Sequence, residues 1–157
     1  MEPALVELKE RLAEIADPER ARAVLAWDME VYMPPSGGGS RGTQLATLSA
    51  LIHRGVTHDR IGELLDEVEP WAATLPRDSD DACLVRSTRR KFEKNRRIPT
   101  ELVAAFRKTR ADAYGAWVKA REESDFAVFR PLLERILELK LEMVECFAPY
   151  ENAYDVL

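Results

Sequence analysis

The sequence predicts an all-α protein. Apolar residues recur at spacings of three and four along most of the chain, as in Leu5, Leu8 and Leu12, and this is the period of one helix face. No stretch alternates apolar and polar residues for long enough to form a strand, and no Asn-Gly or Asp-Gly hairpin turn occurs. With 157 residues, 46% of them hydrophobic, we expect one compact helical unit.

The N-terminal quarter is predicted to form two helices and a loop. The first helix ends at the Asp17-Pro18 break, and the second ends at Met33-Pro34 because a proline disfavours helical backbone in the residue before it. Residues 36–40, Ser-Gly-Gly-Gly-Ser, are the only low-complexity segment and are predicted to be a flexible loop. Ser40 would then cap the third helix.

Four more helices are expected after the third. Thr57 caps the first of them, which ends at Pro70, and a polar connection follows over residues 76–81. The next helix extends toward Arg97, Pro99 marks the entry to another, and Ser124 or Asp125 caps the last. The last helix carries a long apolar stripe that includes Leu137, while Leu139 and Leu141 fall outside it. We therefore expect apolar surface to remain exposed on this helix.

The charge balance favours neither nucleic acid nor a membrane as a partner. The chain has 23 basic and 28 acidic residues, a net charge of -5 that is too mild to imply a polyanion. The basic run from Arg86 to Arg97 could bind RNA, but its consecutive charges splay around a helix, which favours a solvated face paired with acidic neighbours. The start of the sequence lacks a signal-peptide pattern, and no segment has the roughly 20 apolar residues of a membrane span. Cys83 and Cys146 are isolated cysteines, which fits a reducing compartment, so a cytoplasmic location is expected.

The sequence contains no recognisable catalytic motif. The two histidines, His53 and His58, are five residues apart, whereas two zinc ligands on one helix face need a spacing of three or four. We interpret them as polar residues that flank Gly55. The sequence has no H-E-x-x-H, no G-x-S-x-G and no Walker loop. We therefore assign no catalytic, cofactor-binding or metal-binding residue to the chain.

Asp28 stands out because it places a carboxylate on an otherwise apolar helix face. A buried charge needs a partner, so we expect it to pair with an arginine or with the N-terminus of a neighbouring helix. A position on a cleft wall is the alternative. Trp27 and Trp117 are interpreted as core residues and not as stacking platforms.

A set of short motifs resembles a known enzyme family. They are Leu25-Ala26-Trp27-Asp28, Met33-Pro34, the glycine segment, Arg41, Gln44, Leu48 and His53, followed later by Ile98-Pro99, Trp117, Asp125-Phe126 and Tyr154-Asp155-Val156-Leu157. This order is similar to the opening of the thermostable, Taq-type zinc metallocarboxypeptidases and covers nearly the whole chain. Ala153 departs from it, since a proline is expected before the tyrosine.

The resemblance implies the helical N-terminal segment of a larger enzyme. Such enzymes are all-helical dimers shaped as two walls around a deep cleft, they use zinc, with cobalt as a substitute, and they remove C-terminal amino acids from peptides. Their H-E-x-x-H motif and substrate-gripping groups would lie beyond the position that matches Leu157. We therefore expect residues 1–157 to be inactive alone, to bind no zinc, and to need the remaining catalytic region as a partner. The alternative is a free-standing helical interaction module.

Overall fold

The structure is a computed structural model that describes residues 2–156, and these residues form helices and no strand. The α-helices are α1 (Pro3–Val31), α2 (Gly38–Val56), α3 (Asp59–Ala72), α4 (Asp80–Arg96), α5 (Thr100–Glu123) and α6 (Arg130–Glu145). Three 3-10 helices join or follow them: η1 (Pro35–Gly37), η2 (Phe126–Val128) and η3 (Ala153–Val156). The predicted all-α class is confirmed.

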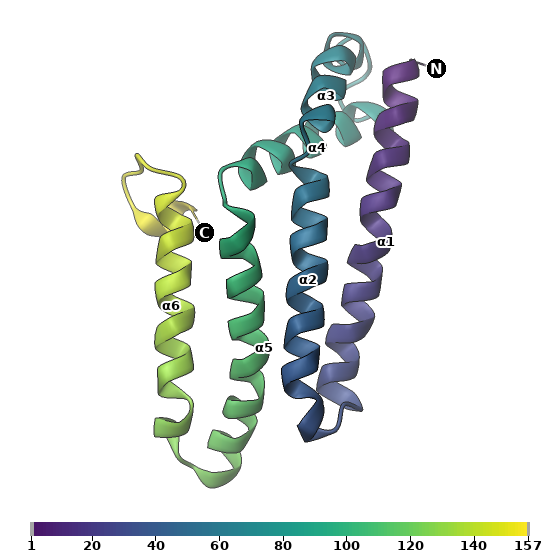
Figure 1. The fold of residues 1–157 in the computed structure, drawn as a ribbon. Helices are drawn as coiled ribbons and strands as arrows, with labels where there is room; N and C mark the ends of the chain where they lie inside the picture. Colours follow the sequence, from purple (N-terminus) through teal and green to yellow (C-terminus); the bar gives the residue numbers. More distant parts are fainter. Residues whose placement is uncertain (1, 157) are drawn as a thin grey trace.

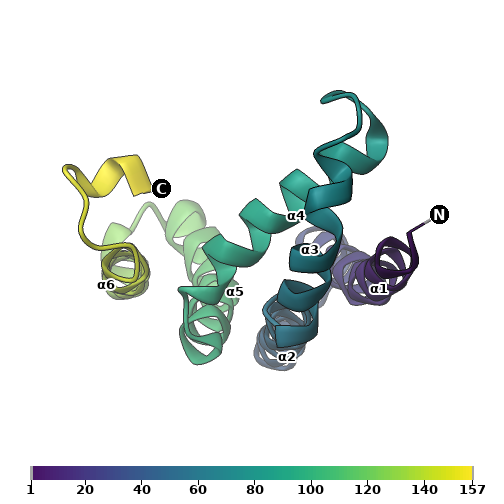
Figure 2. The same ribbon diagram turned by 90° about the horizontal axis from the view of Figure 1, so that it is seen from above.

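Four of the helices form a row that is one helix thick. α1, α2, α5 and α6 lie side by side in that order, and α3 and α4 pack at one end of the row (Figure 1). Seen along the helix axes the row is curved, and α4 extends from α3 toward the start of α5 (Figure 2). The expectation of a compact unit is therefore wrong, because the helices form an open layer.

The open layer exposes more surface than a compact protein of the same mass. Its accessible surface is 10082 Å². A compact monomer of 17.8 kDa is expected to expose about 8,000 Å². The excess follows from the arrangement, since a row that is one helix thick leaves two faces uncovered.

The main hydrophobic core lies at one end, where α1, α3 and α4 meet. Its most deeply buried side chains are Leu5, Leu8, Ile61, Leu64, Leu65 and Val68, each at most 1% exposed. At the edge of this core, the Arg60 guanidinium donates two hydrogen bonds to the Glu7 carboxylate, at 3.0 and 2.7 Å. Together with Arg11, Arg60 lowers the pKa of Glu7 to about 2, so the pair stays charged at neutral pH.

The predicted break at Asp17-Pro18 is wrong, because α1 runs through Pro18. The missing proline N–H leaves the carbonyl of Glu14 without its helical donor, and Glu14 is exposed, so water can satisfy that carbonyl. Packing on both sides of the proline favours a continuous helix. Ile15 lies against Gly55 of α2, and the Leu25 carbonyl accepts a bond from Arg41 of α2.

The predicted flexible loop at residues 36–40 is also wrong. Most of this segment is helical: it ends η1 at Gly37 and begins α2 at Gly38, so Ser40 lies inside the first turn and does not cap it. The ion pair between Arg41 and Asp28 fixes this first turn against α1.

Other boundaries shift by one or a few residues. His58, and not Thr57, caps α3 by accepting a bond from the Arg60 amide, while Thr57 donates to the His53 carbonyl at the end of α2. α3 continues past Pro70 to Ala72, and α4 begins at Asp80, so the polar connection occupies residues 73–79 and not 76–81. Asp125 is a cap as expected, but it caps η2, because its carboxylate accepts from the Ala127 amide.

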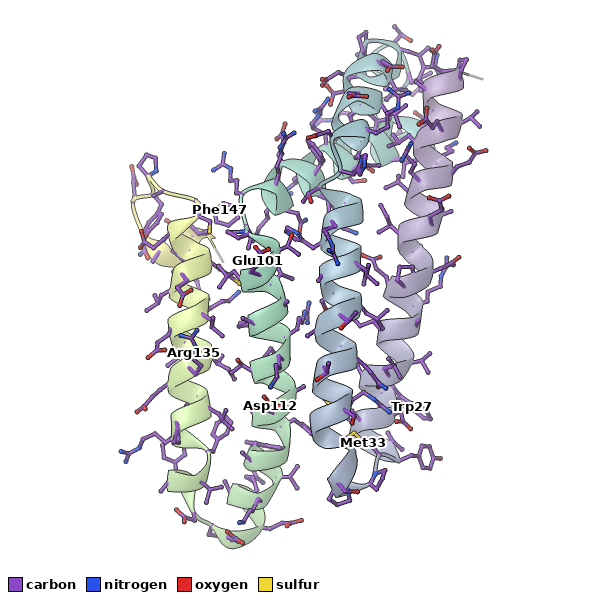
Figure 3. All side chains as sticks on the ribbon, in the orientation of Figure 1. Trp27, Met33, Glu101, Asp112, Arg135 and Phe147 are labelled. Carbon is purple, nitrogen blue, oxygen red and sulfur yellow. The ribbon has the colours of Figure 1, made fainter. Side chains whose placement is uncertain are left out.

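Several apolar side chains lie where the periodicity did not place them. Trp27 and Trp117 are 55% and 43% exposed, so their interpretation as core residues is wrong. Trp27 projects from the end of the row where α1 turns into α2, far from the main core (Figure 3). On α6, Leu139 is buried while Leu137 and Leu141 are exposed, because α6 packs mainly against α5 and leaves its other faces open. The prediction that the apolar residues outside the main stripe of α6 are exposed is therefore confirmed for Leu141 and wrong for Leu139.

The contact between α3 and α4 provides a test of core packing. A Cβ atom at Gly62 would lie 2.8 Å from Cζ of Phe92, whose side chain is 4% exposed and cannot move away. We expect Gly62→Ala to lower the free energy of unfolding by about 1–3 kcal/mol. Gly38→Ala is the control, since its Cβ meets nothing within 4 Å and its backbone is already helical. Urea unfolding of both variants measures this, and equal stability of the two would contradict the packing described.

Candidate functional site

The motif residues at the junction of α1 and α2 are brought together around Arg41. Its guanidinium lies 2.6 Å from the Asp28 carboxylate, donates to the Leu25 carbonyl at 2.6 Å, and donates to the Gln44 side chain at 3.1 Å. The Arg41 side chain is 14% exposed and that of Asp28 34%. The predicted arginine partner of Asp28 is thus confirmed, and the cluster joins two helices.

His53 forms a second joint, between α2 and the connection from α4 to α5. It is buried, its Nε2 lies 3.0 Å from the Asn95 carbonyl oxygen, and its Nδ1 lies 2.9 Å from the Thr100 hydroxyl. A carbonyl oxygen can only accept, so Nε2 carries the proton and the hydroxyl donates to Nδ1. Both ring nitrogens are occupied by these bonds, and His53 therefore acts as a structural link.

The basic run of α4 is largely engaged with neighbouring groups. Its ion pairs join Arg89 to Asp66 and Glu69, Lys91 to Glu19, and Arg96 to Asp59, while Lys94 and Arg97 lie over the ring of Phe147. The hydrogen bonds that Arg89 donates to Glu69 and Asp66 raise its pKa against the opposing effect of burial. The predicted pairing with acidic neighbours is confirmed for these arginines and lysine.

The described residues do not fit a metal ion. Within residues 2–156 no three His, Cys, Asp or Glu side chains gather in a group that could hold one. His53 uses both ring nitrogens, as described above, and Nδ1 of His58 accepts the Arg60 amide. Cys83 lies in α4, where its thiol donates to the Arg77 carbonyl and accepts from Arg86, and Cys146 directly follows α6, where its thiol donates to the Glu142 carbonyl.

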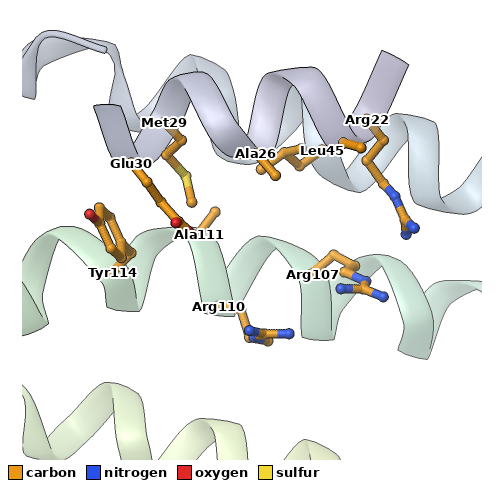
Figure 4. A pocket seen from close by; sticks show the side chains of 10 residues that line it. Arg22, Ala26, Met29, Glu30, Leu45, Arg107, Arg110, Ala111 and Tyr114 are labelled. Carbon is orange, nitrogen blue, oxygen red and sulfur yellow. The ribbon is translucent and has the colours of Figure 1, made fainter. Parts of the chain in front are cut away.

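A groove lies between α1 and α5, with Leu45 of α2 in its wall. Its volume is about 250 Å³. Arg22 of α1 and Arg107 of α5 lie at one end, and Glu30 and Tyr114 lie at the other (Figure 4). The remaining lining residues are Ala23, Ala26, Met29, Arg110 and Ala111. We call this hollow the α1–α5 groove.

Burial lowers the pKa of Arg107, and the positive charges of Arg22 and Arg110 lower it further. The guanidiniums of Arg22 and Arg107 thus lie at one end of a groove whose other walls are mainly apolar. Such an arrangement favours a negatively charged guest. Sequence reasoning missed these residues. The spacing of Arg107, Arg110 and Tyr114 marks one face of α5, but nothing in the sequence shows that α1 faces it across α2.

Comparison with known proteins identifies the family. The model of the Carboxypeptidase Taq (M32) metallopeptidases matches residues 7–157, and the chain belongs to that family. It is 35% identical over 144 residues to thermostable carboxypeptidase 1 of Thermus thermophilus, with 86% of this chain and 28% of that protein covered. It is 29% identical over 146 residues to carboxypeptidase 1 of Bacillus subtilis, with 93% and 29% covered.

Solved structures share the fold. The crystal structure of BsuCP is 27% identical, has a TM-score of 0.91, and is matched over 98% of this chain and 31% of that one. The M32 carboxypeptidase of Deinococcus radiodurans is 32% identical, with a TM-score of 0.67 and 97% and 30% covered. The chain therefore spans less than a third of the length of these relatives.

The Arg41 joint can be tested by substitution. Arg41→Ala removes an ion pair and two further bonds from a side chain that is 14% exposed, and it leaves the Asp28 carboxylate without its partner. We expect a loss of about 2–3 kcal/mol in the free energy of unfolding, and a smaller loss for Arg41→Lys, which keeps the charge but not the planar fork.

Arg20→Ala is the matched control for this joint. Arg20 pairs with Asp17 on the same helix, both side chains are more than three-quarters exposed, and such surface pairs contribute little. The free energy of unfolding, measured in urea, should not change measurably for this variant. If Arg41→Ala were as harmless as Arg20→Ala, the joint would not hold α1 to α2.

Proposed function

We propose that this chain forms part of the helical wall of a zinc-dependent carboxypeptidase that removes C-terminal amino acids from peptides. The observation that carries the proposal is the family match over residues 7–157 of a chain that spans under a third of its relatives. In this proposal the metal and the catalytic groups belong to other parts of the enzyme. The residues described here position helices.

The shape of the layer supports a role as a wall. A row that is one helix thick, with 10082 Å² of accessible surface, has two faces available for a larger body. The joints at Arg41 and His53 hold α1, α2, α4 and α5 in fixed register, which a wall of a cleft requires. In the same proposal the partners are the rest of the enzyme, peptide substrates, and a second copy in a homodimer.

We also propose a cytoplasmic location. Cys83 and Cys146 are both free thiols, and a reducing compartment suits unpaired cysteines. Across residues 2–156 the helices are too short or too polar to span a bilayer. A fluorescent reporter of a reducing environment, fused to the chain and expressed in its native cells, would test this location.

The most direct experiment is to sequence the transcript beyond codon 157 and to express its continuous product. The proposal expects an open frame that encodes H-E-x-x-H and a product that releases the last residue of an N-acyl dipeptide when zinc is present. A stop codon directly after position 157 would overturn it and would favour the free-standing helical module.

The isolated chain is expected to lack this activity. Residues 1–157 incubated with an N-acyl dipeptide, with or without added zinc or cobalt, should release no C-terminal amino acid, because the described residues hold no metal-ligand group. The Thermus thermophilus relative is the positive control. Turnover that follows the chain through a final sizing column would show that catalytic groups are present in it.

A further inference from the structure

A hollow lined by aromatic rings lies where α5 turns toward α6, at the end of the row opposite α3 and α4 (Figure 1). Its volume is about 380 Å³. We call it the aromatic hollow, and its lining residues are Trp117, Ala120, Arg121, Ser124, Phe126 and Phe129. Neither the Arg41 joint nor the His53 joint uses any of these residues, so their side chains are available for another role.

The backbone at the end of α5 builds this hollow. Ser124 adopts a left-handed conformation with φ of 53°, and the Asp125 amide donates to the Ala120 carbonyl at 2.9 Å, which ends the helix. The Asp125 carboxylate then accepts the Ala127 amide and starts η2. Because η2 packs back against α5, Phe126 lines the same hollow as the side chains of the last turns of α5.

The rings of the hollow expose much of their apolar area. Trp117 is 43% and Phe126 57% exposed. Phe126 meets Phe129 edge to face, with the ring centroids 6.3 Å apart, so the two rings are held as one wall. Aromatic surface left in water is unfavourable, and tryptophan and arginine are the residues that contribute most to binding at protein interfaces. The hollow therefore has the composition of an interface anchor site.

Arg121 adds a positive charge to the rim of the hollow. Its guanidinium lies over the Trp117 ring, 5.7 Å from the ring centroid, and a guanidinium stacked in this way still donates hydrogen bonds in its own plane. Two nearby carboxylates have other partners, since Glu123 lies 4.0 Å from Lys119 and Asp125 caps η2. An apolar cavity with a guanidinium at its edge is complementary to an apolar side chain with a carboxylate beside it.

The shape of the hollow favours a protein segment over a small molecule. Small-molecule sites bury about 70–90% of the ligand surface. Here two of the walls are themselves about half exposed, so a small ligand would stay largely in water. A protein segment covers the rim as well as the hollow. The chain spans less than a third of the length of its relatives, so the larger enzyme supplies such a segment.

We infer that the aromatic hollow docks a segment of the larger enzyme that carries a large apolar side chain next to a glutamate or aspartate. The apolar side chain would contact Trp117 and Phe126, and the carboxylate would bond to Arg121. This inference rests on the proposed function, because the partner is the rest of that enzyme. The experiment therefore tests the chemistry of the hollow and the source of the segment in separate arms.

The first arm titrates the 157-residue chain with the peptide acetyl-Glu-Phe-Glu-amide and follows the indole N–H signals of its tryptophans by NMR. The Trp117 signal should shift saturably. The Trp27 signal should not shift, although Trp27 is 55% exposed, because it lies outside the hollow. Replacing the phenylalanine of the peptide by alanine, or both glutamates by glutamines, should raise Kd about fivefold or more.

Arg121→Gln tests the assigned ion pair. It should raise Kd of the glutamate peptide to that of the glutamine peptide and leave Kd of the glutamine peptide unchanged. Arg121 is exposed, so the variant should keep its fold, which its backbone amide signals report. Arg54→Gln makes the same change in charge at an exposed arginine of α2 and should change Kd by less than about twofold.

Three outcomes of the first arm would overturn the inference. They are the absence of a saturable Trp117 shift, an equal shift of Trp27, and a preference for glutamate over glutamine that survives Arg121→Gln. Each shows that the hollow does not recognise an apolar side chain next to a carboxylate, whatever the longer product does.

The second arm compares the 157-residue chain with the continuous product by hydroxyl-radical footprinting and mass spectrometry. Oxidation of Trp117 and Phe126 should be about fivefold slower or more in the continuous product, because the docked segment shields both rings. An active carboxypeptidase in which both rings are oxidised as fast as in the isolated chain would overturn this inference and leave the proposed function standing. A stop codon directly after position 157 would remove the partner and overturn both.

Discussion

A layer that is one helix thick cannot cover its own faces, and this constraint governs the rest of the structure. Each inner helix of the row packs mainly against the helix on either side, with α2 also meeting α4 at His53, so apolar residues that face up or down from the row have few neighbours. The deep core is therefore confined to the end where α1, α3 and α4 meet in a second layer. Elsewhere the chain is held by contacts along the row itself.

Those contacts rely on small residues and on polar joints. Along α2 and α5 the helices approach closely, since a Cβ atom at Gly42 would lie 3.4 Å from Cβ of Ala111. Arg41 and His53 then fix the register at two points of α2 with directional bonds. Such joints set the geometry of the row with little buried area. The charged α1–α5 groove lies on this same frame.

The sequence predicts the helical class well because the apolar period extends over most of the chain. It also predicts the arginine partner of Asp28, since a charge on an apolar face requires one. It fails at Pro18, where packing of α1 against α2 overrides local propensity, and at the glycine segment, where the ion pair of Arg41 with Asp28 fixes the start of α2 against α1. Trp27 and Leu139 are misplaced because periodicity does not show which face of a helix has a neighbour. The groove escapes prediction because its arginines lie about 85 residues apart in the chain and meet only through the order of helices in the row.

We propose that the two faces of this layer are built to be covered. Light scattering coupled to size exclusion, over a tenfold range of concentration and with a dye that reports exposed apolar surface, tests it directly. The account predicts that the isolated chain binds the dye and that its mass rises with concentration, because Val24, Trp27, Leu137 and Leu141 are each more than half exposed. A dye-negative monomer at every concentration would contradict the claim and would show that the chain satisfies its own surface.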